Sequence, residues 1–163
     1  MTQTLEHPTA IDRLSIYKVA PGLYDAMMKL STASATDVDP TIGELIKIRA
    51  SQINHCAFCL DMHVTDARKQ GETEQRLYVL SAWREAPFFS DRERAALAWT
   101  EALTLVATKG APDEATHEAL AAQFSAEEQV KLTMLINAIN GWNRIAVGFR
   151  LFYPAAQAAV AAA

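Results

Sequence analysis

The sequence predicts an all-α protein. Hydrophobic residues recur about every 3.6 positions along most of the chain, and no segment alternates hydrophobic and polar residues as a half-buried strand does. β-Branched residues are scattered, and glycines and prolines divide the chain into segments of helical length. We therefore expect about six to seven helices in a single domain that covers residues 1–163, with its core at about 15–152 and an alanine-rich tail at 155–163.

Three segments in the first half of the chain have helical patterns. An apolar face recurs at helical spacing over residues 24–31, and a second one follows Pro40 over residues 42–53. A shorter pattern covers residues 76–85 and carries a tryptophan. These patterns predict three helices separated by proline- or glycine-containing connections.

The second half carries clearer helix boundaries. One long pattern begins at Asp91 and ends at Lys109-Gly110, because a basic residue followed by glycine is typical of a helix C-terminus. Proline and acidic residues at 112–114 suit the first turn of the next helix. Ser125 and Glu128 form a capping box before the most apolar segment, so we expect a last helix from about 126 to 151.

Composition excludes several classes of function. The chain has 163 residues, of which 50% are hydrophobic and 21% charged, which is ordinary for a soluble globular domain. Its net charge of −4 and its lack of a Lys/Arg cluster argue against nucleic acid or an anionic membrane as the main partner. No apolar run reaches the length of a membrane span and the N-terminus has no signal-peptide pattern, so we expect a cytoplasmic protein.

Both cysteines of the chain lie in one short motif, Cys56-Ala-Phe-Cys59, and His63 follows four residues later. The C-x-x-C spacing permits a disulfide in the first turn of a helix, and a helix places His63 one turn from Cys59 on the same face. In a reducing compartment, such a pair indicates redox chemistry, catalysis or metal binding rather than a structural staple. We interpret the motif as a dithiol redox centre.

Other interpretations of the cysteine pair stay open on the residues alone. A thioredoxin fold is disfavoured, because it needs a βαβ context and residues 41–55 have helical periodicity. Zinc accepts thiolate and imidazole ligands, so Cys56, Cys59 and His63 form a possible set with Glu44 or water as the fourth ligand. A purely structural pair is the remaining alternative. We favour redox chemistry with no metal and no cofactor, since a chain with this much apolar sequence does not need a metal to fold.

The pattern Glu44-x11-Cys56-x2-Cys59-x3-His63 resembles the AhpD-like alkylhydroperoxidases of the carboxymuconolactone decarboxylase superfamily. Residues 135–147 also resemble the final helix of a subgroup of these proteins. The resemblance implies an antioxidant peroxidase that reduces alkyl hydroperoxides or hydrogen peroxide and assembles as a homotrimer or homohexamer. In that scheme Cys59 attacks the peroxide, Cys56 resolves the sulfenic acid, and His63 and Glu44 relay protons. An external dithiol of lipoyl or thioredoxin-like type regenerates the enzyme.

Two points complicate this assignment. The best-studied members of the family have a histidine between the two cysteines, where this chain has Phe58. A helix dipole also acts more strongly on Cys56 than on Cys59, so the choice of Cys59 as the attacking residue rests on the resemblance and on its spacing from His63. The alternatives are a non-enzymatic redox sensor that binds a partner, and a lactone decarboxylase of the same superfamily, which has no need of a cysteine pair.

Polar residues interrupt the apolar last helix at Asn137, Asn140, Asn143 and Arg144. If buried, these groups need hydrogen-bond partners, and otherwise they face solvent or another subunit. We predict that Trp142 and Arg144 lie at a subunit interface, because tryptophan and arginine are enriched at protein interfaces.

Overall fold

The computed structural model describes residues 13–151. They form helices and connections without a strand, which confirms the all-α prediction. The elements are α1 (Ile16–Val19), α2 (Pro21–Ala35), α3 (Pro40–Ile53), α4 (Ala57–Lys69), α5 (Glu74–Val79), the short 3-10 helix η1 (Leu80–Ala82), α6 (Asp91–Thr104), α7 (Val106–Lys109), α8 (Glu114–Gln123) and α9 (Ala126–Phe149). The predicted tail at 155–163 lies outside the described residues, and the single-domain boundary at 1–163 stays a prediction.

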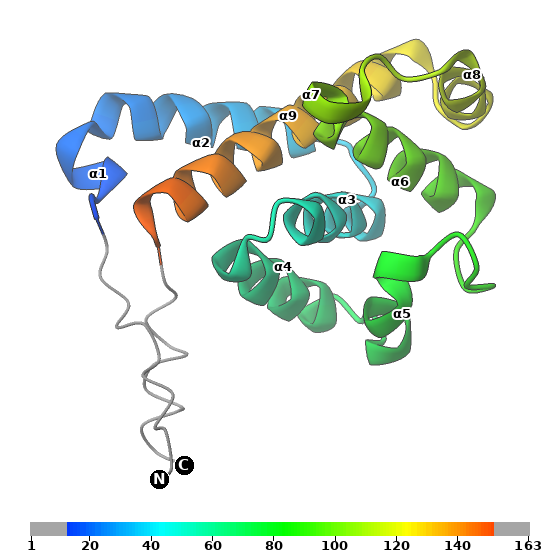
Figure 1. Cartoon of the computed structure of the whole chain (residues 1–163), viewed down its shortest axis with the longest axis horizontal. Coiled ribbons are helices and arrows are strands. Elements are labelled where there is room, and N and C mark those ends of the chain that lie inside the picture. The colour runs from blue at the N-terminus through cyan, green and yellow to red at the C-terminus, as the bar shows by residue number, and fades with distance from the viewer. Residues whose placement is uncertain (1–12, 152–163) are drawn as a thin grey trace, which may run out of the picture.

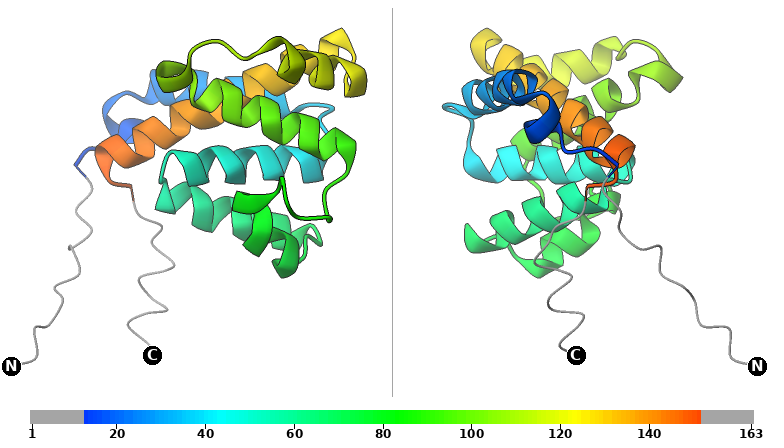
Figure 2. Two further views of the ribbon diagram at one scale, coloured as in Figure 1. Left: turned by 45° about the vertical axis from the view of Figure 1, so that its right-hand side comes forward. Right: turned by 90° about the vertical axis from the view of Figure 1, so that its left-hand side faces the viewer.

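Helix α3 lies in the middle of the molecule (Figure 1). It packs against α4 on one side and against α6 and α9 on the other. The longest helix, α9, runs beside α2 and also contacts α3, α4 and α6, and the views in Figure 2 show the same stacking. None of the helices within residues 13–151 is long and apolar enough to cross a membrane.

The core lies on both faces of α3. Ile42 and Ile46 belong to a buried cluster with side chains of α6, α8 and α9, whereas Leu45 and Ile48 belong to a second cluster with α4, α5 and α6. A helix that is covered on several sides must carry apolar residues around most of its circumference. Glu44 is therefore an exception that requires a reason, since its side chain lies in this buried helix.

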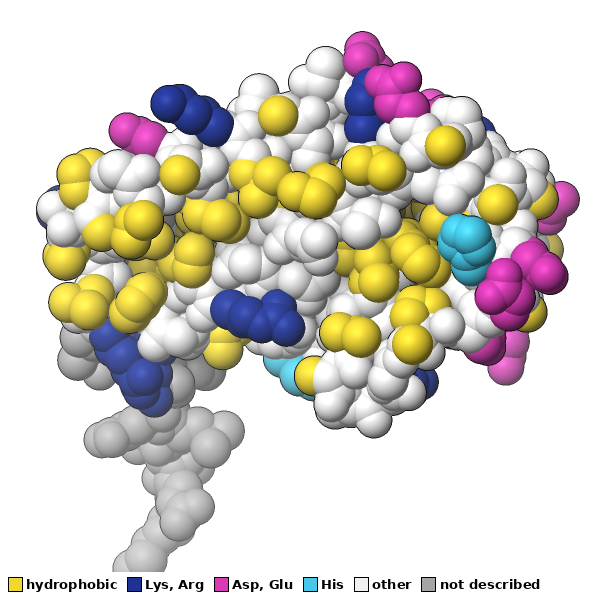
Figure 3. All heavy atoms as spheres, turned by 90° about the horizontal axis from the view of Figure 1, so that it is seen from above, with side chains coloured by type: hydrophobic (Ala, Val, Ile, Leu, Met, Phe, Trp, Pro, Cys, Tyr) yellow, Lys and Arg dark blue, Asp and Glu magenta, His cyan; other side chains and the backbone are white. Residues whose placement is uncertain are grey.

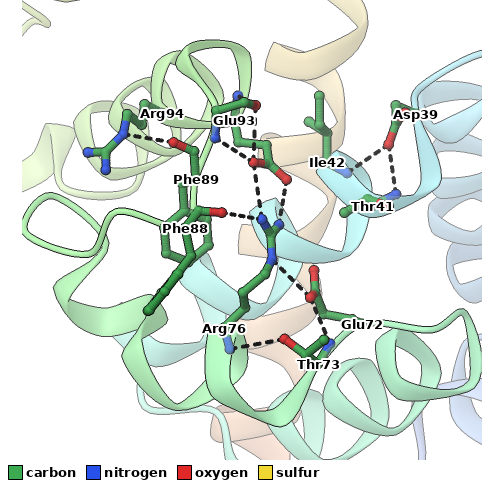
Figure 4. A network of polar contacts seen from close by, with 11 residues as sticks. Asp39, Thr41, Ile42, Glu72, Thr73, Arg76, Phe88, Phe89, Glu93 and Arg94 are labelled. Atoms are coloured by element: carbon green, nitrogen blue, oxygen red, sulfur yellow. Dashed lines mark hydrogen bonds and ion pairs between the residues drawn. The ribbon is translucent and has the colours of Figure 1, made fainter.

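Side-chain caps define where several helices begin. The carboxylate of Asp39 accepts hydrogen bonds from the backbone N–H groups of Thr41 and Ile42, at 2.9 and 3.1 Å, and so caps α3 (Figure 4). Capping boxes start α6 at Ser90 and α9 at Ser125. The second of these confirms the predicted start of the last helix, which ends at Phe149 because Arg150 has a left-handed backbone with φ of 54°.

The prediction of one helix from Asp91 to Lys109 is wrong. Helix α6 ends at Thr104, Leu105 leaves the helical conformation, and α7 adds a single turn before Gly110 at φ of 79°. β-Branched residues at 104, 106 and 108 lower the helix propensity of this stretch, and the hydroxyl of Thr104 accepts a hydrogen bond from Asn140 of α9. Likewise the pattern at 76–85 forms α5 from Glu74 and then tightens into η1.

An ion-pair network joins the connections on either side of α5 to α6 (Figure 4). The guanidinium of Arg76 donates to Glu72 at 2.9 Å, to Glu93 at 2.5 Å and to the carbonyl of Phe88 at 2.5 Å. It also lies over the ring of Phe89, 4.8 Å from the ring centre. This network holds the segment between α5 and α6 in place.

Candidate redox site

Cys56 and Cys59 form a disulfide at the start of α4, with Cα atoms 5.4 Å apart. Cys56 is the N-cap residue, and its Sγ accepts a hydrogen bond from the backbone N–H of Cys59 at 3.3 Å. Cys59 lies within the first turn. Both side chains are only 1% exposed, and they pack against Ile139 and Ala146 of α9. The predicted C-x-x-C pair is therefore close enough to bond and is shielded from bulk solvent.

A sharp turn between α3 and α4 places Cys56 at the start of α4. Helix α3 ends at Ile53, His55 has a left-handed backbone with φ of 55°, and the N–H of Cys56 donates to the carbonyl of Ser51 at 3.0 Å. The chain reverses within three residues, so α4 packs back along α3. This reversal brings Glu44 on α3 and His63 on α4 together, although 19 positions separate them in the sequence.

Glu44, His63 and Lys47 form a connected group beside the disulfide. Nδ1 of His63 lies 3.0 Å from Oε2 of Glu44, and Nζ of Lys47 donates to Oε1 of the same carboxylate at 2.7 Å. Glu44 is 7% exposed and His63 is 9% exposed. A buried carboxylate needs such partners, because an unpaired charge away from water is strongly destabilising.

The balance of burial and pairing lowers the pKa of Glu44. Burial alone raises this pKa, but the hydrogen bonds from His63 and Lys47 and the charge of Lys47 outweigh it and bring the pKa below its ordinary value. Glu44 is therefore ionised at neutral pH. An ionised carboxylate only accepts hydrogen bonds, so Nδ1 of His63 carries the shared proton and Nε2 is the ring nitrogen left to act on another group.

A cavity of about 450 Å³ opens on this group. Cys59 and His63 line it, whereas Cys56 and Glu44 do not. The remaining lining residues are mostly apolar and come from α1, α2, α3, α4, α9 and the segment after it: Ile16, Tyr17, Tyr24, Met28, Ser31, Lys47, Phe58, Met62, Leu135, Ala138, Ile139, Trp142, Ala146 and Leu151. A molecule in the cavity thus meets one cysteine, one histidine and an apolar wall.

The wall of the cavity is fixed by aromatic side chains. Nε1–H of Trp142 donates to Oγ of Ser31 at 2.6 Å, and the ring of Tyr24 packs edge-on against Trp142 with ring centres 5.7 Å apart. Phe58, which lies between the two cysteines in the sequence, adds apolar surface to this wall. The predicted place of Trp142 and Arg144 at a subunit interface stays a prediction.

Sequence reasoning missed two parts of the site. It assigned no role to Lys47, although the i, i+3 spacing from Glu44 signals a pair on one helix face. It also left the asparagines of α9 undecided, and the structure shows Asn140 and Asn143 buried and hydrogen-bonded, whereas Asn137 and Arg144 are exposed. No group of three or more His, Cys, Asp or Glu side chains within residues 13–151 is arranged to hold a metal ion.

Comparison with known proteins identifies the family. A model of the carboxymuconolactone decarboxylase family matches residues 21–102. The uncharacterised protein YdfG of Bacillus subtilis is 47% identical over 136 residues, which cover 83% of this chain and 92% of YdfG. The chain belongs to the carboxymuconolactone decarboxylase family. Another relative, the uncharacterised YnjA of Escherichia coli, is 34% identical over 103 residues, which cover 63% of this chain and 56% of YnjA.

Solved structures place this member of the carboxymuconolactone decarboxylase family among AhpD-like proteins. A protein of unknown function from Agrobacterium tumefaciens, for which an antioxidant defence role as AhpD has been suggested, matches with a TM-score of 0.84 and 46% identity over 88% of this chain and 99% of its own. The debrominase Bmp8, in complex with 2,3,4-tribromopyrrole, matches with a TM-score of 0.74 and 18% identity over 86% and 76% of the two chains, and so shares the fold. The AhpD-like resemblance predicted from the motif is confirmed.

Proposed function

We propose that this protein is a thiol-dependent peroxidase in which Cys59 reduces an organic hydroperoxide and Cys56 closes a disulfide. One observation carries the proposal: Cys59 and His63 line the same cavity, and His63 is bonded on its far side to the ionised Glu44. This is the arrangement of a nucleophile beside a histidine whose orientation is set by a third group.

The first step joins sulfur to oxygen. The thiolate of Cys59 attacks the terminal oxygen of the hydroperoxide, the O–O bond breaks, and the sulfur becomes a sulfenic acid. Nε2 of His63 takes the proton of the Cys59 thiol as the thiolate forms and gives it to the departing alkoxide, which leaves as an alcohol. Glu44 holds the ring through Nδ1 in both protonation states.

Proton transfer to the leaving oxygen contributes more to the rate of this step than a lowered pKa of the thiol does. A free thiol with a pKa of ~8.5 is only about 3% ionised at pH 7, and lowering that pKa also lowers the intrinsic nucleophilicity of the thiolate. For a drop of ~2.5 units the two effects leave a gain of only about twofold with a Brønsted slope of ~0.45. A positioned general acid contributes about 10²–10⁴-fold, which is the role assigned to His63.

The second step forms the disulfide. The thiol of Cys56 attacks Sγ of the Cys59 sulfenic acid, the S–O bond breaks, and the hydroxyl group leaves as water with the proton that Cys56 gives up. In the closed pair the Cα atoms lie 5.4 Å apart, within the range for a disulfide.

An external dithiol then reduces the disulfide. Cys59 is the cysteine that lines the cavity, so the reductant attacks its sulfur and Cys56 leaves as a thiolate. The backbone N–H of Cys59 already points at Sγ of Cys56 at the helix N-terminus, which favours negative charge there. A stabilised leaving thiolate speeds the exchange, and the second thiol of the reductant then releases Cys59.

The cavity favours a hydroperoxide with an apolar body. Its wall removes the organic group from water, and each square ångström of apolar surface so buried contributes about 25 cal/mol. Hydrogen peroxide gains nothing from this wall. Family membership supports a homotrimer or homohexamer and a lipoyl-type or thioredoxin-like reductant. These, together with the cytoplasmic location expected from the sequence, form part of the proposal.

Rapid mixing of the fully reduced protein with cumene hydroperoxide and with hydrogen peroxide tests the proposal. We expect loss of two thiols in the wild type, loss of one thiol in Cys56→Ser, and no reaction in Cys59→Ser. Thiol loss that persists unchanged in Cys59→Ser contradicts the assignment. Oxidation by peroxide that is slow in all three proteins would favour a redox sensor over an enzyme.

A further inference from the structure

We infer that Asn54, Asn140 and Asn143 form an amide network that sets the reduction potential of the Cys56–Cys59 pair. The network ties the turn before Cys56 to helix α9. It acts on the dithiol couple itself, so the inference is independent of the substrate and of the peroxidase proposal.

The hydrogen bonds of the network connect three helices. Nδ2 of Asn54 donates to Oδ1 of Asn140 at 2.8 Å and to Oδ1 of Asn143 at 2.9 Å. Nδ2 of Asn143 donates to Oγ of Ser51 at 3.0 Å, and Nδ2 of Asn140 donates to Oγ1 of Thr104 at 3.0 Å. The end of α3, the end of α6 and the middle of α9 are joined in this way.

Burial of these amide groups is unfavourable in free energy unless each of their polar atoms has a hydrogen-bond partner. Asn143 is 1% exposed and Asn140 is 7% exposed. The side-chain oxygen and nitrogen of both residues have partners, and such fully paired buried networks rigidify their surroundings. An apolar residue at either position would avoid the cost of removing an amide from water. The amide pairs therefore serve to fix the position of the turn against α9, and not only to stabilise the contact.

The network and the disulfide share one face of α9. Ile139 and Ala146 belong to the buried cluster that contains both cysteines, and Asn143 lies between them at helical spacing. The same stripe of α9 therefore packs against the two sulfurs and binds the turn that carries one of them.

The turn is held at both of its ends. The side chain of Asn54 binds α9, and the N–H of Cys56 donates to the carbonyl of Ser51 at 3.0 Å. Only His55 lies between these two anchors, with a left-handed backbone that few residue types adopt readily. Cys56 consequently has little freedom to move away from Cys59.

This restraint acts mainly on the dithiol form. In the disulfide form the S–S bond restrains the turn by itself, whereas in the reduced form the network is what keeps Cys56 near Cys59. Removal of the network raises the conformational entropy of the reduced form more than that of the oxidised form. The pair then becomes easier to reduce, so its potential becomes less negative.

The test is the equilibrium of Asn54→Ala with a glutathione or dithiothreitol redox buffer, followed by mass-spectrometric counting of free thiols. We expect the equilibrium constant for disulfide closure to fall about tenfold, which is a rise of about 30 mV for this two-electron couple. Asn143→Ser is a second variant, with a shift in the same direction. Denaturant unfolding of each reduced protein separates a change in potential from a loss of the fold.

The matched control is Thr133→Val, which removes another hydrogen bond between α6 and α9, from Nε1 of Trp99 to Oγ1 of Thr133 at 2.9 Å. We expect its potential to equal that of the wild type. An unchanged potential in folded Asn54→Ala and Asn143→Ser, or an equal shift in Thr133→Val, overturns the inference. Failure of both asparagine variants to fold also overturns it, because the network then maintains the fold and not the potential.

Discussion

Nδ1 of His63 on α4 lies 3.0 Å from Oε2 of Glu44 on α3, and this pair lies between the core of the protein and its cavity. The ring of His63 lines the cavity beside Cys59, whereas Glu44 does not line it and is only 7% exposed. The pair thus connects a buried fixed charge to the place where a peroxide oxygen would leave.

Replacement of His63 by glutamine is expected to slow the reaction with cumene hydroperoxide by about 10²–10⁴-fold, because the general acid is lost. The second-order rate constant of thiol loss, measured by stopped flow, gives the result. Asp61→Asn is the control, since Asp61 is an exposed residue of the same helix. A loss of less than about fivefold in His63→Gln would mean that the leaving oxygen takes its proton from another source.

Replacement of Glu44 by glutamine is expected to weaken the dependence of stability on pH. The pKa of Glu44 is lowered in the folded protein, so its ionisation stabilises the fold above the ordinary pKa of a glutamate and this contribution disappears as the pH falls through the lowered value. Glu93 and Glu101 contribute with the same sign, because their pKa values are also lowered. The free energy of unfolding, measured with urea at pH 7 and at pH 4, should therefore fall less between the two pH values in Glu44→Gln than in the wild type. An equal fall in both proteins would refute this role of Glu44.

Replacement of Met28 by alanine is expected to discriminate between substrates. Met28 lines the cavity yet is 41% exposed, so its loss removes substrate contact with little cost to the core. About 40–60 Å² of lost apolar contact corresponds to a rate decrease of about five- to twelvefold for cumene hydroperoxide, with no change for hydrogen peroxide. Leu23→Ala is the control, as Leu23 lies on the same helix, is 68% exposed and does not line the cavity. Equal effects on both peroxides would place the organic group elsewhere.

Replacement of Arg76 by methionine is expected to lower the free energy of unfolding by about 2–3 kcal/mol, since two largely buried carboxylates lose their partner. The side chains of Glu72 and Glu93 are only 9% and 12% exposed. Denaturant unfolding at pH 7 measures the loss. Arg68→Met, which breaks a solvent-exposed pair with Glu74, should change stability by less than about 1 kcal/mol. A loss in Arg76→Met as small as that in the exposed pair would show that the network in Figure 4 adds little stability.

The exposed apolar side chains of α2 and α9 bear on the predicted assembly. Leu23 and Met28 of α2 and Val130, Met134 and Val147 of α9 are all exposed, and Figure 3 shows hydrophobic side chains gathered on the face that these two helices form. Apolar surface of this kind is typical of interaction sites. Sedimentation of the full chain decides between a monomer and the homotrimer or homohexamer predicted from the family.

Much of this fold could be predicted because its signals are local. The capping box at Ser125, the apolar stripe of α9 and the pair of cysteines at the start of α4 each depend on residues within a few positions of one another. The break at Leu105 could not be predicted from the continuous apolar pattern, because the competing contact comes from Asn140, 36 positions after Thr104.

In the candidate site, too, the parts with a sequence signal could be predicted and the long-range contacts could not. Glu44 and His63 were predicted as partners through the spacing of a family motif, and the structure places them in contact. The amide network was not predicted, because Asn54 and Asn143 are 89 positions apart and no pattern in the sequence around either residue indicates a contact with the other. Lys47 carries a local signal in its spacing from Glu44, but that spacing alone does not reveal that both belong to a buried site beside a cavity.

The most direct test of the central claim is to trap the sulfenic acid in Cys56→Ser. The reduced variant is mixed with one equivalent of cumene hydroperoxide in the presence of dimedone, and the modified residue is located by peptide mass spectrometry. We predict a dimedone adduct on Cys59, formed at a rate that His63→Gln in the same background lowers by about 10²-fold or more. No adduct on Cys59, or an adduct that forms equally fast without His63, would contradict the proposed mechanism.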